Sequence, residues 1–200
     1  MSGDADLGWA AYYPKLKDRP PRHTATFAAR RFKEPGYAVD LGCGAGRDAL
    51  PLLAQAWRVL AIDKEPDAIA ALLAATPPSL REKLETCNAQ FEDAEWDGPD
   101  LIISSFALPL TPKPAFPALW AKIWTSLKPG GRFAGQIYGE RDTWAREGGP
   151  DGLIAFSRAE CLNLLDGQRI EVFEEEEHPG LTPRGHSKHW HIFHIVAQKP

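Results

Sequence analysis

The stretch "VDLGCGAGRD" at residues 39–48 decides the fold that this sequence specifies. It begins as a short apolar run that contains an acid, Asp40, and continues with glycines at positions 42, 44 and 46. A glycine gives up stability for backbone conformations that side chains disfavour. Three of them in alternation at the end of a strand therefore indicate a loop shaped to fit closely against a ligand.

Strand and helix patterns alternate along the chain on both sides of this loop. Strands that alternate with helices of this length form βαβ units, so the pattern predicts an α/β fold with a doubly wound, mainly parallel sheet. Two further strands have no helix between them and predict an antiparallel hairpin at one edge. The predicted strands are 37–42, 58–63, 84–89, 100–106, 132–139, 169–178 and 189–199, and the predicted helices are 23–32, 47–56, 66–76 and 114–127.

The bulk composition narrows the class of protein. Two hundred residues, 44% of them hydrophobic, suffice for one compact domain over residues 1–200. A net charge of -4 argues against a basic nucleic-acid binder. The three cysteines are scattered without CxxC spacing, which fits a reducing compartment better than a disulfide framework. Since no stretch is apolar for the length of a membrane span, we expect a cytoplasmic protein that acts on small molecules, without a membrane or nucleic-acid partner.

The spacing of the glycines discriminates between ligand classes. In a doubly wound sheet, the first strand-to-helix turn lies nearest the ligand. A dinucleotide site favours GxGxxG, but here Arg47 follows Gly46, and no GK[ST] follows that would indicate a phosphate-binding P-loop. A nicotinamide or flavin dinucleotide is therefore disfavoured and stays an alternative.

The loop instead resembles motif I of the class I S-adenosylmethionine-dependent methyltransferases, in which an acid precedes GxGxG. The likeness continues in "RVLAIDKEPDAI", "PDLIISSFAL" and "LWAKIWTSLKPGGRFAGQIYG", and it extends over residues 36–199. It implies a Rossmann-like methyltransferase fold of seven strands in the order 3-2-1-4-5-7-6, with the last strand antiparallel. Residues 36–199 would form the cofactor-binding core and residues 1–35 an N-terminal lid. The short chain is loosely similar to bacterial tellurite-resistance and thiopurine-type enzymes.

The resemblance also implies which residues contact S-adenosylmethionine. Asp40 would orient the amino group of its methionine moiety, Asp63 would accept hydrogen bonds from both ribose hydroxyls, and Lys64 would flank the adenine. Gln90 and Phe91 would meet the adenine, with Glu92 or Asp93 as alternatives for an acid at this point. The remaining expected contacts are Gly42, Cys43, Gly44, Gly46 and Ser104.

Methyl transfer itself asks for little from the protein. The sulfonium cofactor supplies the activated methyl group and leaves as a neutral thioether, S-adenosylhomocysteine in the product, so a general base is needed only when the nucleophile must lose a proton. The acceptor atom and any base are left open. Candidates for the substrate pocket are Tyr12, Tyr13, Arg19, His23, Ser105, Arg141, His189 and His191.

Each of these candidates also has a structural interpretation. The aromatic residues can pack in the core, and Arg141 can form a surface ion pair. Side chains alternate along a strand, so His189 and His191 share one face of theirs while His194 lies on the other face with Trp190. We expect the glutamates at residues 174–177 to pair across the hairpin with these histidines and with Lys188, and we expect no metal site.

Two alternatives from other classes stay open besides an enzyme. One is an S-adenosylmethionine-binding regulator or subunit without turnover, and the other is the dinucleotide binder. The sequence leaves undecided whether the protein is a monomer or a homodimer.

Overall fold

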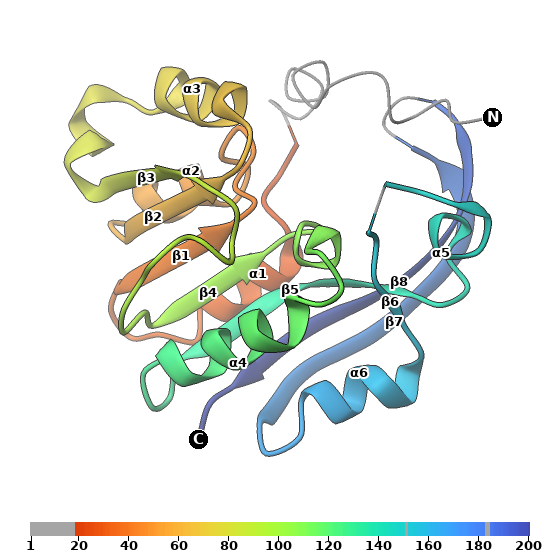
Figure 1. Ribbon diagram of the computed structural model, residues 1–200. Coiled ribbons are helices and arrows are strands. Elements are labelled where there is room, and N and C mark those ends of the chain that lie inside the picture. Colours follow the sequence, from red (N-terminus) through yellow and green to blue (C-terminus); the bar gives the residue numbers. More distant parts are fainter. Residues whose placement is uncertain (1–18, 151, 183–184) are drawn as a thin grey trace.

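One mixed sheet organises the computed structural model, which describes residues 19–150, 152–182 and 185–200. The strand order is β3-β2-β1-β4-β5-β8-β7, and the short β6 pairs with β5 (Figure 1). Only β8 runs antiparallel to its neighbours, β5 and β7. With β6 set aside, this is the expected order, so the predicted fold class is confirmed. The strands are β1 Tyr37–Leu41, β2 Arg58–Asp63, β3 Leu84–Asn88, β4 Leu101–Ser104, β5 Arg132–Gly139, β6 Ala155–Phe156, β7 Arg169–Leu181 and β8 Ser187–Gln198.

Helices cover both faces of the sheet, as double winding requires. One hydrophobic cluster packs α4 against the sheet, where Trp120 lies edge-on to Phe133 at 5.1 Å between ring centroids. A second cluster packs α1 and α2 against the opposite face around Ala28, Leu53 and Val59. The helices are α1 His23–Ala29, α2 Ala49–Ala54, α3 Pro66–Ala75, α4 Phe116–Ser126, α5 Thr143–Glu147 and α6 Arg158–Leu164, with 3₁₀ turns η3 Pro78–Lys83 and η4 Leu108–Leu110.

The segment between β5 and β7 departs from the prediction, which has no element there. It forms α5, β6 and α6. The start of α6 carries a capping box in which Ser157 accepts a hydrogen bond from the Glu160 N–H, and the Glu160 carboxylate accepts one from the Ser157 N–H. The S-x-x-E pattern was available in the sequence as a helix-start signal.

The terminal hairpin is longer than predicted and projects beyond the rest of the sheet. The last pair that joins β5 to β8 is Tyr138 with Ile192, so among the described residues the part of β8 before Ile192 pairs with β7 alone. This two-stranded end lies across from α3, and Figure 1 shows it rising beside α5. The projecting hairpin and the glycine loop, which we call the two arms, thus lie on opposite sides of one cavity.

A buried ion pair fixes α5 to the projecting hairpin. Asp142 is fully buried, and its carboxylate lies 2.8 Å from Nζ of Lys188. The same carboxylate accepts hydrogen bonds from the N–H groups of Trp144 and His191, at 2.9 and 3.1 Å. The predicted pairing of Lys188 with the glutamate run is therefore wrong, because a buried ammonium needs a buried partner. The histidines do pair with that run, as expected: His189 with Glu177, His191 with Glu175 and His194 with Glu176.

Substitution of Asp142 by Asn should lower the free energy of unfolding by about 3–5 kcal/mol, because it removes the carboxylate charge from an ion pair in which both side chains are buried. Urea denaturation measures the change. The matched control is the double variant Asp142→Asn/Lys188→Met, which removes both charges and should recover much of the loss. A double variant as unstable as the single one would show that the charge pair is not the cause.

Candidate functional site

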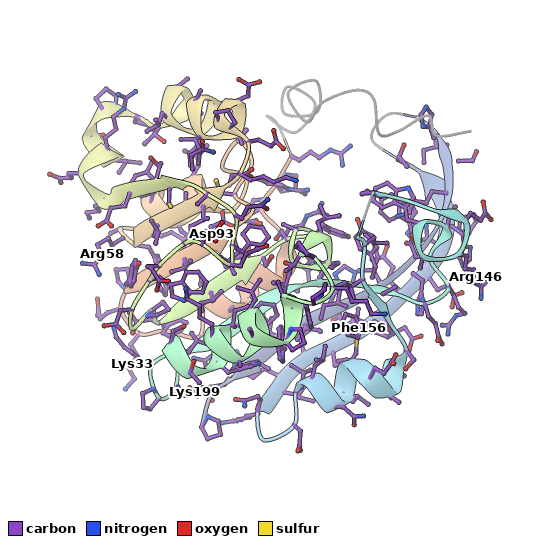
Figure 2. All side chains as sticks on the ribbon, viewed as in Figure 1. Lys33, Arg58, Asp93, Arg146, Phe156 and Lys199 are labelled. Carbon is purple, nitrogen blue, oxygen red and sulfur yellow. The ribbon has the colours of Figure 1, made fainter. Side chains whose placement is uncertain are left out.

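A cavity of about 1290 Å³ opens at the carboxyl ends of the parallel strands. This is where open α/β sheets bind their ligands. Side chains of the two arms surround it, whereas Lys33 and Lys199 lie at the far margin of the molecule (Figure 2). Two parts of its wall differ in chemistry. We name them the glycine-loop compartment, lined by Asp40, Gly42, Gly44, Asp63, Lys64, Gln90 and Phe91, and the aromatic compartment, lined by Phe106, Tyr138, Trp144, Glu176, Trp190, Ile192 and His194.

Hydrogen bonds attach the glycine loop to the end of β2. The N–H groups of Gly42 and Cys43 both donate to the Ile62 carbonyl, at 2.8 and 3.1 Å, and Gly44 N–H donates to the Asp63 carboxylate at 2.9 Å. Gly42 has a φ of 78°, and a Cβ there would collide with the Cβ of Ala107. Glycine at position 42 thus allows the close approach of Ala107 from the segment that follows β4.

Gly46 serves a different purpose from Gly42. Its φ is 88°, and a Cβ at this position would collide with the side chain of Leu72 on α3. Close packing of α3 thus requires glycine here. Cys43 also lines the cavity, and burial raises the pKa of its thiol well above the ordinary range, so that it packs as a neutral side chain.

Asp40 is the most exceptional group in the glycine-loop compartment. It is 2% exposed, and its Oδ2 has no hydrogen-bond partner among the described residues. Burial raises the pKa of Asp40 well above its ordinary range, and the carboxylates of Asp48 and Asp63 raise it further. A buried carboxylate with a free oxygen and two acidic neighbours is a site for a cationic ligand group.

Asp63 also lines the cavity, at the end of β2. Its Oδ2 accepts from Gly44 N–H and its Oδ1 from Glu65 N–H at 3.0 Å. Burial raises the pKa of Asp63, although these two hydrogen bonds oppose the shift. Each carboxylate oxygen has a second lone pair, so that the group can still accept from two ligand hydroxyls.

The other predicted contacts divide into two groups. Lys64, Gln90 and Phe91 line the cavity together with Glu92, whereas Asp93 does not. Ser104 is expected from the sequence to contact the cofactor, but this residue is fully buried. Its hydroxyl donates to the Leu41 carbonyl at 3.1 Å and accepts from Leu108 N–H at 3.0 Å. Its hydroxyl therefore joins the ends of β1 and β4 to η4 and does not reach the cavity.

Ser105, the next residue, does line the cavity. It donates to Oδ2 of Asp48 at 2.6 Å, while Arg22 N–H donates to the other oxygen of Asp48 at 2.7 Å. Arg47 Nε donates to the Pro20 carbonyl at 2.7 Å. These contacts hold residues 20–22 across the start of α2 at the mouth of the cavity.

The N-terminal candidates have different outcomes. Arg19 lines the cavity. His23 does not line it; this residue begins α1, lies 3.4 Å from Glu174 and contacts the His194 ring at 4.7 Å between centroids. Tyr12 and Tyr13 lie outside the described residues.

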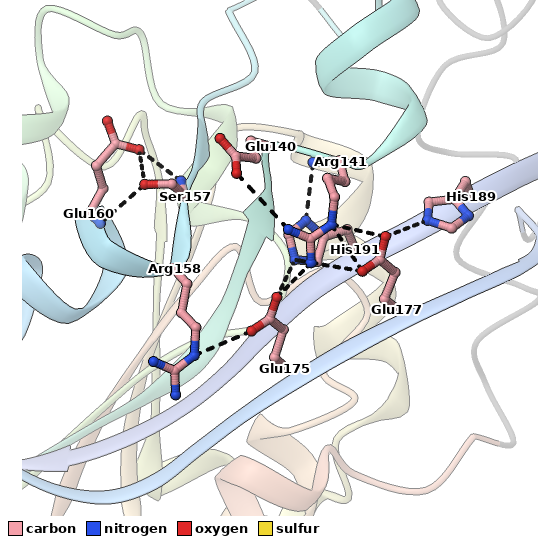
Figure 3. Close-up of polar contacts among 9 residues, drawn as sticks. All are labelled: Glu140, Arg141, Ser157, Arg158, Glu160, Glu175, Glu177, His189 and His191. Atoms are coloured by element: carbon pink, nitrogen blue, oxygen red, sulfur yellow. Dashed lines mark hydrogen bonds and ion pairs between the residues drawn. The ribbon is translucent and has the colours of Figure 1, made fainter.

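Arg141, His189 and His191 gather on the opposite face of the hairpin from the cavity (Figure 3). The Arg141 guanidinium lies 2.7 Å from both Glu175 and Glu177, and His189 Nε2 lies 2.9 Å from Glu177. His191 accepts from Arg141 N–H at Nδ1. The surface ion pair foreseen as the alternative for Arg141 is thus what the structure contains.

Three residues of this cluster carry side chains of the kinds that bind metal ions. Ligand atoms of Glu175, Glu177 and His191 lie within 4.8 Å of one another. The Arg141 guanidinium contacts all three groups and supplies the positive charge between them. Its hydrogen bonds, followed by that of His189, lower the pKa of Glu177 to about 2.

Four rings form the wall of the aromatic compartment. Phe106 contacts Tyr138 and Trp190 at centroid distances of 5.8 and 6.5 Å, and Trp144 contacts the same two rings at 5.6 and 6.0 Å. The Lys188 ammonium lies 3.5 Å from the Trp144 ring centroid and 3.8 Å from that of Trp190. Phe106 has a φ of 63°, an uncommon conformation for a residue with a side chain.

His194 lines the cavity, whereas His189 and His191, the two β8 histidines proposed from the sequence, do not. His194 is 6% exposed. Its Nε2 lies 2.6 Å from Oε2 of Glu176, whose other oxygen lies 2.6 Å from His178. The available signal is strand alternation, because Trp190, Ile192 and His194 occupy alternate positions on β8 and all line the cavity.

A protein-family model matches the part of the chain that contains the glycine loop. Residues 38–131, from β1 to the turn before β5, match the model of a methyltransferase domain. The chain carries a methyltransferase domain over these residues. No curated protein matches the sequence. None of the helices within the described ranges is long and apolar enough to cross a lipid bilayer.

Several solved structures share the fold of this chain. TehB from Haemophilus influenzae is 18% identical with a TM-score of 0.72; the match covers 88% of this chain and 61% of TehB. The 1,6-didemethyltoxoflavin-N1-methyltransferase of Burkholderia thailandensis, solved with S-adenosylhomocysteine, is 20% identical with a TM-score of 0.64, covering 94% and 80%. The partner of the Trm112 methyltransferase activator from Haloferax volcanii is 21% identical with a TM-score of 0.70, covering 96% of each chain.

S-adenosylmethionine is the cofactor of this domain, and the glycine-loop compartment fits it in charge and shape. The free oxygen of buried Asp40 suits the ammonium of its methionine part. Gly42 and Gly44 both line the cavity with positive φ, which suits close contact between the ligand and the backbone. Asp63 has acceptor capacity left for a diol.

Substitution of Asp40 by Asn should stabilise the ligand-free methyltransferase at neutral pH and weaken its binding of S-adenosylmethionine. Because the folded-state pKa of Asp40 is raised, the folded protein binds this proton more tightly than the unfolded chain does. Stability therefore falls as pH rises from the unfolded value, about 3.9, through the raised one. Urea midpoints between pH 4 and 8 should show this fall flattened in the variant. Parallel pH profiles for the two proteins would contradict the assignment.

Proposed function

We propose that this protein transfers the methyl group of S-adenosylmethionine to a small-molecule acceptor. The observation that carries the proposal is that both compartments belong to one cavity of about 1290 Å³. Pockets for single ligands commonly measure 300–1,000 Å³, so this volume suits a cofactor and a modest acceptor together. The Burkholderia thailandensis enzyme, which is named for a small heterocyclic acceptor, supports the same class.

In this proposal the glycine-loop compartment holds the cofactor. Asp40 binds its ammonium group, Asp63 accepts from the ribose hydroxyls, and Gln90 and Phe91 border the adenine with Lys64. The bound cofactor supplies an electrophilic methyl group and leaves as a neutral thioether. The chain supplies position and exclusion of water.

The acceptor enters on the aromatic side. Phe106 and Tyr138 face it from two neighbouring strand ends, and Arg22, whose guanidinium carbon lies 4.3 Å from the Phe106 ring centroid, covers the junction. Arg19 and Arg22 line the cavity, which supports the lid prediction for residues 19–22, whereas α1 within the predicted lid of residues 1–35 packs against the sheet. The net charge of -4 favours a small acceptor over a nucleic acid, and three free cysteines favour the cytoplasm.

Calorimetric titration with S-adenosylmethionine, S-adenosylhomocysteine and NAD tests the cofactor half. We expect micromolar binding of both sulfur compounds and none of NAD. Binding of NAD alone would favour the dinucleotide alternative, and no binding of either sulfur compound would refute the proposal. Formation of S-adenosylhomocysteine with an acceptor panel then separates an enzyme from a binding protein without turnover.

Replacement of Asp63 by Ala should weaken S-adenosylmethionine binding at least about tenfold, roughly 1.4 kcal/mol, because it removes a charged acceptor and the anchor of Gly44. Asp93→Ala is the matched control, since Asp93 is an acid of the same region that does not line the cavity. Equal affinities of the two variants would refute the placement of the ribose.

A further inference from the structure

We propose that His194, oriented by Glu176, is the general base of this methyltransferase, and that the acceptor is a flat aromatic compound that attacks through a hydroxyl or ring N–H group. The inference rests on the proposed function and names the substrate class of that same site. His194 belongs to β8 and Glu176 to β7, and both side chains line the aromatic compartment.

The tautomer of His194 follows from its partner. Glu176 lies 2.6 Å from Nε2, and an ionised carboxylate only accepts hydrogen bonds, so Nε2 carries the proton. Nδ1 then presents a lone pair. This atom is buried and makes no hydrogen bond within the part of the chain that the structure describes. Such an orphaned acceptor costs stability and suits a site that awaits a donor.

A second orphaned acceptor lies next to it. Gln136 pairs with His194 across the β5–β8 ladder and is 1% exposed. Its amide nitrogen donates to Thr24 at 2.8 Å, which leaves Oε1 without a partner among the described residues. Because Gln136 itself does not line the cavity, Nδ1 of His194 is the acceptor of this pair that an X–H group of a ligand can reach.

The environment holds His194 in the form that a base requires. Burial lowers the pKa of His194, although the hydrogen bond to Glu176 opposes the shift. The charged and titratable groups that face it are Glu174 and Glu176 from β7 and His23 from α1, while β5 contributes the neutral Gln136. The imidazole is therefore unprotonated at neutral pH.

The walls define the shape of the acceptor. Four rings, Phe106, Tyr138, Trp144 and Trp190, surround the compartment beside His194. Aromatic rings bind a planar ring by stacking and edge contacts with little loss of their own conformational freedom. A planar ring that bears an O–H or N–H meets both the walls and the free Nδ1.

The proposed step balances as follows. The acceptor oxygen or nitrogen forms a bond to the methyl carbon as the carbon–sulfur bond breaks, and the electron pair of that bond stays on sulfur. The X–H proton passes to Nδ1 of His194, and the resulting imidazolium is stabilised by the Glu176 carboxylate. The proton on Nε2 then leaves through Glu176, whose side chain is 43% exposed.

The test compares acceptors that need a base with acceptors that do not. The panel contains phenols and ring N–H heterocycles, with thiophenols as shape-matched acceptors that are ionised at neutral pH. With His194→Gln, we expect kcat for the phenols to fall about 10²–10⁴-fold. The thiophenol rate and the calorimetric affinity for S-adenosylmethionine should stay within about threefold.

The pH profile adds a readout that a structural role would not affect. Wild-type kcat/KM for phenols should fall as pH drops through the lowered pKa of His194, and this acid limb should vanish in His194→Gln. Glu176→Gln is a second variant, for use if His194→Gln does not fold, because Glu176 is partly exposed and its replacement should leave the fold intact. It should lower kcat for phenols and leave the thiophenol rate unaffected. His189→Gln is the matched control, because it breaks the same type of ion pair on the other face of β8.

Equal losses on phenols and thiophenols, or none on phenols, would overturn the assignment of the base. No turnover of any aromatic acceptor by a protein that binds S-adenosylmethionine would overturn the substrate class and leave the cofactor site standing. Failure to bind S-adenosylmethionine would instead refute the proposed function itself.

Discussion

The attachment of the glycine loop to the end of β2 is the constraint on which the rest of the site depends. The loop makes its anchoring bonds to the Ile62 carbonyl and to the Asp63 carboxylate. The position of the loop is therefore set by the strand next to its own. Because Asp63 both holds Gly44 and faces the cavity, the residue that shapes the loop also contributes to the binding surface. A change in β2 would move both together.

The same region concentrates negative charge where water is scarce. Burial raises the pKa of Asp40, the least exposed of the three acids, and the carboxylates of Asp48 and Asp63 raise it further. S-adenosylmethionine carries a sulfonium and an ammonium, so in the proposed complex these charges would offset the repulsion. Ligand binding and stability would then be coupled through the same carboxylates.

Much of the fold and half of the site could be predicted from the sequence, because the signals are local. The alternating strand and helix patterns, the glycine spacing and the acid at the end of β2 each lie within a short window. The fourth-strand serine could not be assigned in this way, since Ser104 bonds to Leu41 across the sheet. The pair of Lys188 with Asp142 also depends on tertiary structure.

The histidines show this limit most clearly. Alternation along β8 correctly separates His189 and His191 from His194 and Trp190. Which of the two faces meets the cavity depends on the pairing with β5 and on the twist of the sheet, neither of which a single strand reveals. A correct local pattern therefore led to candidates on the other face, where Arg141 holds them in an ion cluster.

The projecting end of the hairpin has a mechanical consequence. Beyond Tyr138, β7 and β8 form a ribbon without a third strand, and such ribbons twist more than wide sheets do. Trp190 and His178 lie on this ribbon, opposite the rigidly packed start of η4. One wall of the aromatic compartment is therefore carried by two strands, whereas the opposite wall belongs to the wide part of the sheet. The width of the compartment depends on the twist of this ribbon, which the buried Asp142–Lys188 pair ties to α5.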